Sequence, residues 1–206
     1  GGAYKSTDGG DTWSEANNGL ADLSLQALAL SPGFVSDQTL FVGASSGVFK
    51  STDAGSNWSN SSSGLLGKRV FALAISTDFA VDHTLFAGTL SFDASPEQGV
   101  YKSTDGGTSW SWASNGITDL KIKALAISPG WAGDKTIYAA TDEGGVFKST
   151  NGGDAWSAVK TGLSNLNVQA LALSPAYASD QTLFAGTNGG VFKTTDGAAS
   201  WSAVNT

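Results

Sequence analysis

The amino-acid sequence predicts an all-β fold, and three observations support this prediction. Near-copies of one eight-residue segment return five times, from AYKSTDGG at residues 3–10 to VFKTTDGA at residues 191–198. Short runs of alternating small and large apolar residues lie between the copies. The 206 residues include 27 glycines and only four prolines, a composition typical of many short strands joined by tight turns.

The copies follow a regular period. The acidic residue of each copy, or its equivalent, lies at Asp8, Asp53, Asp105, Asn151 and Asp196, so the copies are about 45 residues apart, with one longer interval. A repeat of this length is a structural unit that stacks on its neighbours. We therefore expect one domain over residues 1–206, built from similar units.

Each period holds four segments that we interpret as strands. The first is an apolar run such as residues 27–31, ALALS, which we expect to be the innermost strand and to be buried on both faces. The second resembles residues 39–43, TLFVG, the third is the VFKST run of residues 48–52, and the fourth follows a tryptophan, as in WSAV at residues 156–159. Four antiparallel strands per 45 residues are typical of a β-propeller blade.

Counting these segments predicts eighteen strands. The chain begins with a third and a fourth segment and then runs through four full sets. We expect about five blade positions, with the N-terminal blade lacking its two inner strands. The alternative is an open arc that belongs to a longer propeller of six or seven blades.

The repeated box has the form Ser/Thr-x-Asp-x-Gly-x-x-Trp and occupies residues 6–13, 51–58, 103–110, 149–156 and 194–201. A short carboxylate accepts hydrogen bonds from backbone N–H groups that a tight turn leaves unpaired, and glycines adopt positive φ there. The tryptophan is expected to fill space against the neighbouring blade. We predict a structural role for Asp8, Trp13, Asp53, Trp58, Asp105, Trp110, Asn151, Trp156, Asp196 and Trp201.

These boxes resemble the Asp-box, or BNR, repeats of sialidases, sortilin-type receptors, xyloglucanases and photosystem II assembly factors. The resemblance covers essentially the whole chain and implies a β-propeller. Two copies depart from the pattern, because Asn151 replaces the acid and Ala198 replaces the second glycine. A sialidase site clamps its substrate with three arginines, whereas Arg69 is the single arginine here.

The composition excludes several classes of function. A net charge of -7 cannot supply the clustered positive surface that nucleic acids require. The chain has no apolar run of the roughly 20 residues that cross a bilayer. It has no cysteine and only one histidine, His83, so we expect no catalytic site, no metal and no cofactor.

The function expected from these features is a non-catalytic module that binds a protein partner or assembles with itself. The alternatives are a carbohydrate-binding, lectin-like propeller and a fragment of a larger glycoside hydrolase. A lectin with one site per blade would repeat its site residues, whereas here the loops vary and the frame repeats. The best candidate binding loop is the insertion that carries Phe92, Asp93 and Glu97.

The expected location is extracellular or at the cell surface. Low charge content and many Ser, Thr and Asn residues fit a secreted protein. The chain contains no methionine and begins Gly1-Gly2, from which we expect that it was processed from a longer one.

Overall fold

The structure, a computed structural model, describes residues 1–65, 67–90 and 98–205. Its strands form one two-stranded sheet and four four-stranded antiparallel sheets, which we number as blades 1 to 5. Blade 1 contains β1 (Tyr4–Lys5) and β2 (Ser14–Glu15). The other blades contain β3 (Leu25–Leu30), β4 (Leu40–Ala44), β5 (Gly47–Ser51) and β6 (Ser59–Asn60); β7 (Val70–Ile75), β8 (Leu85–Thr89), β9 (Gly99–Ser103) and β10 (Ser111–Trp112); β11 (Ile122–Ile127), β12 (Ile137–Thr141), β13 (Val146–Ser149) and β14 (Ser157–Ala158); β15 (Val168–Leu173), β16 (Leu183–Thr187), β17 (Gly190–Thr194) and β18 (Ser202–Ala203).

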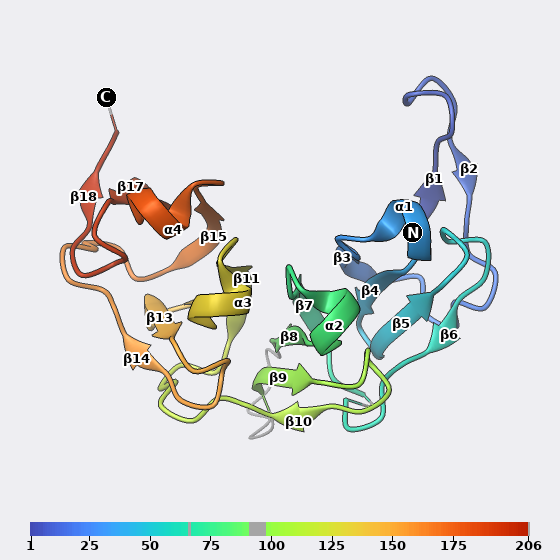
Figure 1. Cartoon of the computed structure of the whole chain (residues 1–206), viewed down its shortest axis with the longest axis horizontal. Helices are drawn as coiled ribbons and strands as arrows, with labels where there is room; N and C mark the ends of the chain where they lie inside the picture. Colours follow the sequence, from blue (N-terminus) through green and yellow to red (C-terminus); the bar gives the residue numbers. More distant parts are fainter. Residues whose placement is uncertain (66, 91–97, 206) are drawn as a thin grey trace.

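The blades are arranged in an arc that is open between the two ends of the chain (Figure 1). The first strands of neighbouring complete blades contact one another, so β3, β7, β11 and β15 line the inner side. The propeller architecture and the incomplete N-terminal blade predicted from the sequence are therefore confirmed. Within the described residues the strands number eighteen, as the repeat pattern predicts.

The prediction that the first strand of each blade is buried on both faces is wrong. Strand β3 alternates between half-buried and exposed residues, and three of the six residues of β15 are exposed. Strand β7 alternates between buried and half-buried residues, and β11 is half-buried after its first residue. The second strands β4, β8 and β12 are instead buried along their whole length, because each lies in the middle of a blade between two other blades. An open arc leaves the inner strands accessible.

One-turn helices connect the first and second strands of each complete blade, and the sequence pattern did not predict them. They are α1 (Phe34–Asp37), α2 (Phe79–Asp82), α3 (Trp131–Asp134) and α4 (Tyr177–Asp180). Each begins with an aromatic residue and ends at a left-handed residue, which is His83 in α2. His83 thus takes the same cap position as Gln38, Lys135 and Gln181.

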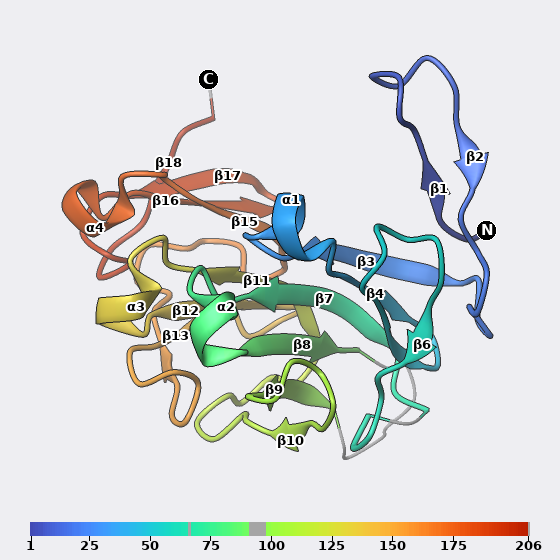
Figure 2. The ribbon, with the colours of Figure 1, turned by 45° about the vertical axis from the view of Figure 1, so that its right-hand side comes forward.

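The hydrophobic core lies between blades rather than within one sheet. Three of its four clusters combine buried residues of two neighbouring blades, such as Phe41 of blade 2 with Phe79 and Trp110 of blade 3. The buried residues of the fourth cluster all belong to blade 2, with Ala3 of blade 1 packed against them. The β1–β2 hairpin stands away from the rest of the molecule (Figure 2). All helices in the described residues have four residues, and none is long and apolar enough to cross a membrane.

Candidate binding surfaces at the ends of the arc

The five boxes form the same hydrogen-bonded turn. At its start a Ser or Thr hydroxyl donates to the side-chain oxygen of the Asp or Asn two residues later, at 2.6–2.8 Å. The same oxygen accepts the backbone N–H four residues further on, at 2.9–3.0 Å. Asn151 makes both contacts through its amide oxygen, so the turn does not require a negative charge.

The box carboxylates are held in their charged form by these contacts. The side-chain hydrogen bond from Asn57, together with the backbone N–H of the same residue, lowers the pKa of Asp53 to about 2. The Ser200 hydroxyl has the same effect on Asp196, whose pKa is also about 2. The hydrogen bonds that Asp53 and Asp196 accept come from residues of their own turns. Each of these acids therefore stabilises the turn of its own blade.

The box tryptophans join one blade to the preceding one. Trp58, Trp110, Trp156 and Trp201 are 4–6% exposed, and each indole N–H donates to a backbone carbonyl of the preceding blade at 2.8 Å. Trp13 belongs to blade 1 and, among the described residues, makes no such contact with another blade. It is 63% exposed, and its indole N–H donates to Gly10 within its own turn at 3.0 Å.

Each blade junction also contains a packed glycine that the sequence analysis did not identify. A glycine six residues after a box tryptophan packs on the backbone of the next box tryptophan, as Gly64 does on Trp110. A Cβ atom at these glycines would lie 2.1–2.2 Å from the tryptophan carbonyl oxygen, so only glycine fits. The set is Gly19, Gly64, Gly116 and Gly162. Their constant distance from the tryptophan was the available signal.

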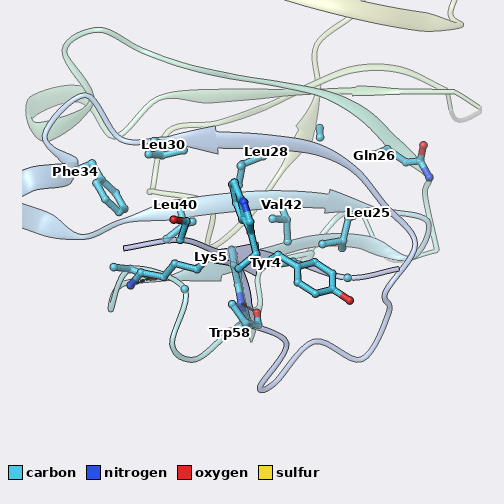
Figure 3. Close-up of a pocket in the computed structure, with 18 residues that line it drawn as sticks. Tyr4, Lys5, Leu25, Gln26, Leu28, Leu30, Phe34, Leu40, Val42 and Trp58 are labelled. Atoms are coloured by element: carbon cyan, nitrogen blue, oxygen red, sulfur yellow. Dashed lines mark hydrogen bonds between the residues drawn. The ribbon is translucent and has the colours of Figure 1, made fainter. Parts of the chain in front are cut away.

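The gap left by the missing inner strands of blade 1 forms a groove, which we call the N-terminal groove. It has a volume of about 530 Å³ and lies between the β1–β2 hairpin and the β3–β4 side of blade 2. Leu25, Val42, Leu40 and Phe34 follow one side of it, and Lys5 lies on the other (Figure 3). Its lining is largely apolar.

The outward face of blade 5 is the second open surface, which we call the C-terminal flank. Phe184 is 37% exposed and Val191 is 42% exposed there. Their counterparts in blade 2, Phe41 and Val48, are fully buried because blade 3 covers them. The C-terminal flank therefore has the composition of a blade junction without the neighbouring blade.

A third, more polar groove lies on the outer side between blades 3 and 4. It has a volume of about 400 Å³ and contains Trp112, Lys102, Asn115 and Asp154. Trp112 is 52% exposed, and Lys102 pairs with Asp154 at 3.1 Å. Trp112 and Trp131 are the two tryptophans outside the five boxes. Trp131 is buried against Phe86 in an edge-to-face contact.

The candidate binding loop predicted from the sequence, with Phe92, Asp93 and Glu97, is not among the residues that the structure describes. His83 lies beside Phe79 at the end of α2. No group of three His, Asp or Glu side chains suited to a metal ion occurs within residues 1–65, 67–90 and 98–205.

No protein-family model and no curated protein matches this chain in sequence. Solved structures do match its fold. An ancestral GH74 enzyme shares 24% identity over 98% of this chain and 28% of its own, with a TM-score of 0.78. The GH74 enzyme of Niastella koreensis shares 22% identity over 98% of this chain and 34% of its own, with a TM-score of 0.74. YCF48 bound to a D1 peptide shares 14% identity over 87% of this chain and 54% of its own, with a TM-score of 0.58.

These comparisons show a β-propeller fold. The chain spans about a third or less of the length of the two GH74 enzymes. Other propeller neighbours include an extracellular domain from B. thetaiotaomicron, with 15% identity, 94% and 24% coverage, and a TM-score of 0.68.

Proposed function

We propose that this chain is a non-catalytic, extracellular propeller module that binds proteins, further copies of itself included, through the open ends of its arc. One observation carries the proposal. Large apolar side chains are exposed at both ends, although their counterparts in the internal junctions are buried or half-buried. They are Tyr4, Trp13, Leu28 and Leu30 at the N-terminal end, and Phe184, Val191 and Val204 at the other.

Exposed apolar side chains gathered on one surface are typical of protein interfaces. Each end of the arc is the complement of the other, because internal blades meet through the same two faces. Contacts of this head-to-tail kind join copies into rings or filaments. The extracellular location is supported by the extracellular domain among the structural neighbours.

Light scattering over a range of protein concentrations tests the proposal. We expect the mass of the wild-type chain to rise with concentration, and Val191→Glu to suppress this rise because it charges the C-terminal flank. Val81→Glu is the matched control, since Val81 is 74% exposed on α2, away from both ends. A wild-type chain that stays monomeric, or equal association by both variants, would contradict self-association.

The non-catalytic part of the proposal rests on how the acids are used. A glycosidase needs two carboxylates placed across a substrate cleft, whereas the acids of the boxes accept hydrogen bonds from their own turns. Xyloglucan is the appropriate substrate to test, because a GH74 xyloglucanase from Xanthomonas campestris is among the structural neighbours. We expect no release of reducing sugar, and measurable release would overturn this part.

Carbohydrate binding is the second candidate, and the groove at Trp112 favours it. An exposed indole beside Asn115, Asp154 and Lys102 offers a stacking face with hydrogen-bonding groups around it. A glycan array probed with the wild-type chain and with Trp112→Ala tests this candidate. Binding that is lost in the variant would support it, and absence of binding to any glycan would reject it.

A further inference from the structure

The N-terminal groove has three internal templates in the same molecule. At each internal junction an aromatic ring of the second strand of one blade meets the aromatic ring that begins the helix of the next blade. Phe41 meets Phe79 at 6.0 Å, Phe86 meets Trp131 at 5.6 Å and Tyr138 meets Tyr177 at 6.0 Å, all edge to face. At the N-terminal groove Phe34 supplies the helix ring, but its partner strand is missing.

A lysine also marks the position of the missing ring. Lys50 and Lys148 lie over the rings of Phe41 and Tyr138 at 5.5 and 5.6 Å, and each donates to a box carbonyl of the next blade at 3.0 Å. Lys5 makes the equivalent bond to Ala54 at 2.9 Å. It is thus already held in place above the empty ring position.

The strand edge that would hold such a ring is free. Val48 and its counterpart Ala3 direct their carbonyls to the outer strand, where Ser61 and Ala16 donate to them at 2.9 Å. Because successive residues of a strand alternate in direction, Tyr4 directs its N–H and C=O toward the open side of β1. An added strand can pair there, as β4 pairs with β5.

The internal junctions also define what the added strand must contain. Phe41 pairs with Lys50 and Gly43 with Val48, so an aromatic residue falls opposite Lys5 and a small residue opposite Ala3. A Cβ atom at Gly43 would lie 2.7 Å from Val70, and one at Gly88 would lie 2.5 Å from Ile122. Leu25 is the counterpart of Val70 in the N-terminal groove. A large side chain two residues after the aromatic one would therefore collide with it.

We propose that the N-terminal groove binds an extended segment of a partner protein with the pattern aromatic–any–small, which adds to the edge of β1 as an antiparallel strand. The small residue is glycine, as at Gly43 and Gly88, or alanine, as at Ala140. Its aromatic ring lies between Phe34 and Lys5, and its small residue lies against Leu25. Addition of a strand to a sheet edge gives affinity through main-chain bonds and selectivity through alternate side chains. This inference rests on the proposed protein-binding function and names the ligand of one of its two surfaces.

A folded second copy cannot supply the strand that adds to β1. The strands of this chain that carry the pattern lie in the middle of blades and are paired on both sides, as β16 is with β15 and β17. The strand must come from a polypeptide in which the segment is unpaired.

A peptide that copies residues 180–187, DQTLFAGT, is the probe. We expect saturable binding of the labelled peptide to the full chain, measured by fluorescence anisotropy. The peptide with Gly186→Val should bind at least about tenfold more weakly, because its side chain meets Leu25, and the peptide with Phe184→Ala should weaken similarly. Equal affinity of the three peptides, or no saturable binding of the parent, would overturn the proposal.

Two protein variants test whether the peptide binds in the N-terminal groove. Phe34→Ala removes the ring that faces the ligand and should reduce affinity about tenfold, whereas Val35→Ala, at a neighbouring residue that is 98% exposed, should not. Circular dichroism of both variants checks the fold. Amide exchange supplies a readout that does not depend on Phe34, since the Tyr4 N–H should become protected when peptide binds to the wild-type chain. An unprotected Tyr4 at saturating peptide would reject strand addition.

The outcome is separable from that of the self-association test. If the peptide fails to bind while the Val191→Glu variant still loses self-association, only the ligand assigned to the groove is wrong. If the peptide does not bind and the wild-type chain does not self-associate, both the assigned ligand and the proposed protein-binding function are wrong.

Discussion

The junction between blades 2 and 3 and the junction between blades 1 and 2 are built from the same repeated sequence, but only the first is filled. The box tryptophans of the two junctions are equally buried, since Trp110 and Trp58 are each 6% exposed, whereas Trp13, on the open side of blade 1, is 63% exposed. Leu73 packs against a buried cluster, whereas its counterpart Leu28 is 61% exposed. The same residue type is thus a core residue or a surface residue according to whether a neighbouring blade is present.

Substitution of Trp110 and of Trp13 gives the largest expected difference. Trp110→Ala should lower the free energy of unfolding by about 3–5 kcal/mol, because it leaves a cavity between two blades and an unpaired carbonyl at Ser61. Trp13→Ala should cost less than about 1 kcal/mol, since Trp13 covers no blade junction. Urea denaturation of both variants measures the difference, and equal losses would contradict the comparison.

The packed glycines give the next largest effect. Gly64 has a φ of +90° and would place a Cβ atom 2.2 Å from the Trp110 carbonyl oxygen, so Gly64→Ala should cost at least about 2 kcal/mol. Gly9 has a φ of +77° but open space around it, and Gly9→Ala should cost about 1 kcal/mol from the backbone alone. The measurement is again urea denaturation. A Gly64→Ala variant as stable as Gly9→Ala would show that the close approach relaxes freely.

Substitution of Asp105 distinguishes the contribution of the turn to stability from that of the blade junction. The hydrogen bonds of Asp105 stay within its own box, so Asp105→Ala should cost about 1 kcal/mol without affecting the burial of Trp110. Tryptophan fluorescence, with its emission maximum unchanged while the melting temperature falls, checks this expectation. Asp11→Ala, an acid outside the pattern in the first box, is the control and should leave the melting temperature unchanged.

The smallest expected change in stability is the loss that follows protonation of a single box carboxylate at low pH. The pKa values of Asp53 and Asp196 are about 2 in the folded chain, below the ordinary value of 3.8. Their contribution to stability is therefore complete above about pH 4 and is lost as the pH falls through 2. Asp53→Asn should flatten the fall in melting temperature over this interval, because an amide does not titrate there. An unchanged slope would contradict the role of this carboxylate.

The sequence predicted the architecture because the frame of each blade repeats. The alternation in residues 27–31 and the runs containing Phe41 and Lys50 identified strands, and counting them located the incomplete blade. The helices at Phe34 and Phe79 were missed because four residues are too short to establish a helical period.

The candidate site was harder to predict from the sequence. The missing strands of blade 1 implied an open edge, but the lining of the N-terminal groove by Phe34, Leu25 and Lys5 depends on residues from blades 1 and 2 meeting in space. The role of Gly64 likewise depends on the backbone of Trp110, 46 residues further along the chain. Only the repetition of its spacing from the tryptophan is visible in the sequence.

The bonds that run from each box tryptophan to the preceding blade connect neighbours only. Cooperativity is then passed along the arc from one unit to the next, as in other linear arrays. The chain should fray from its ends, with the slowest amide exchange in the middle strands β8 and β12 and the fastest in the β1–β2 hairpin. A ligand that closes one end would slow exchange most at that end and progressively less further along the arc.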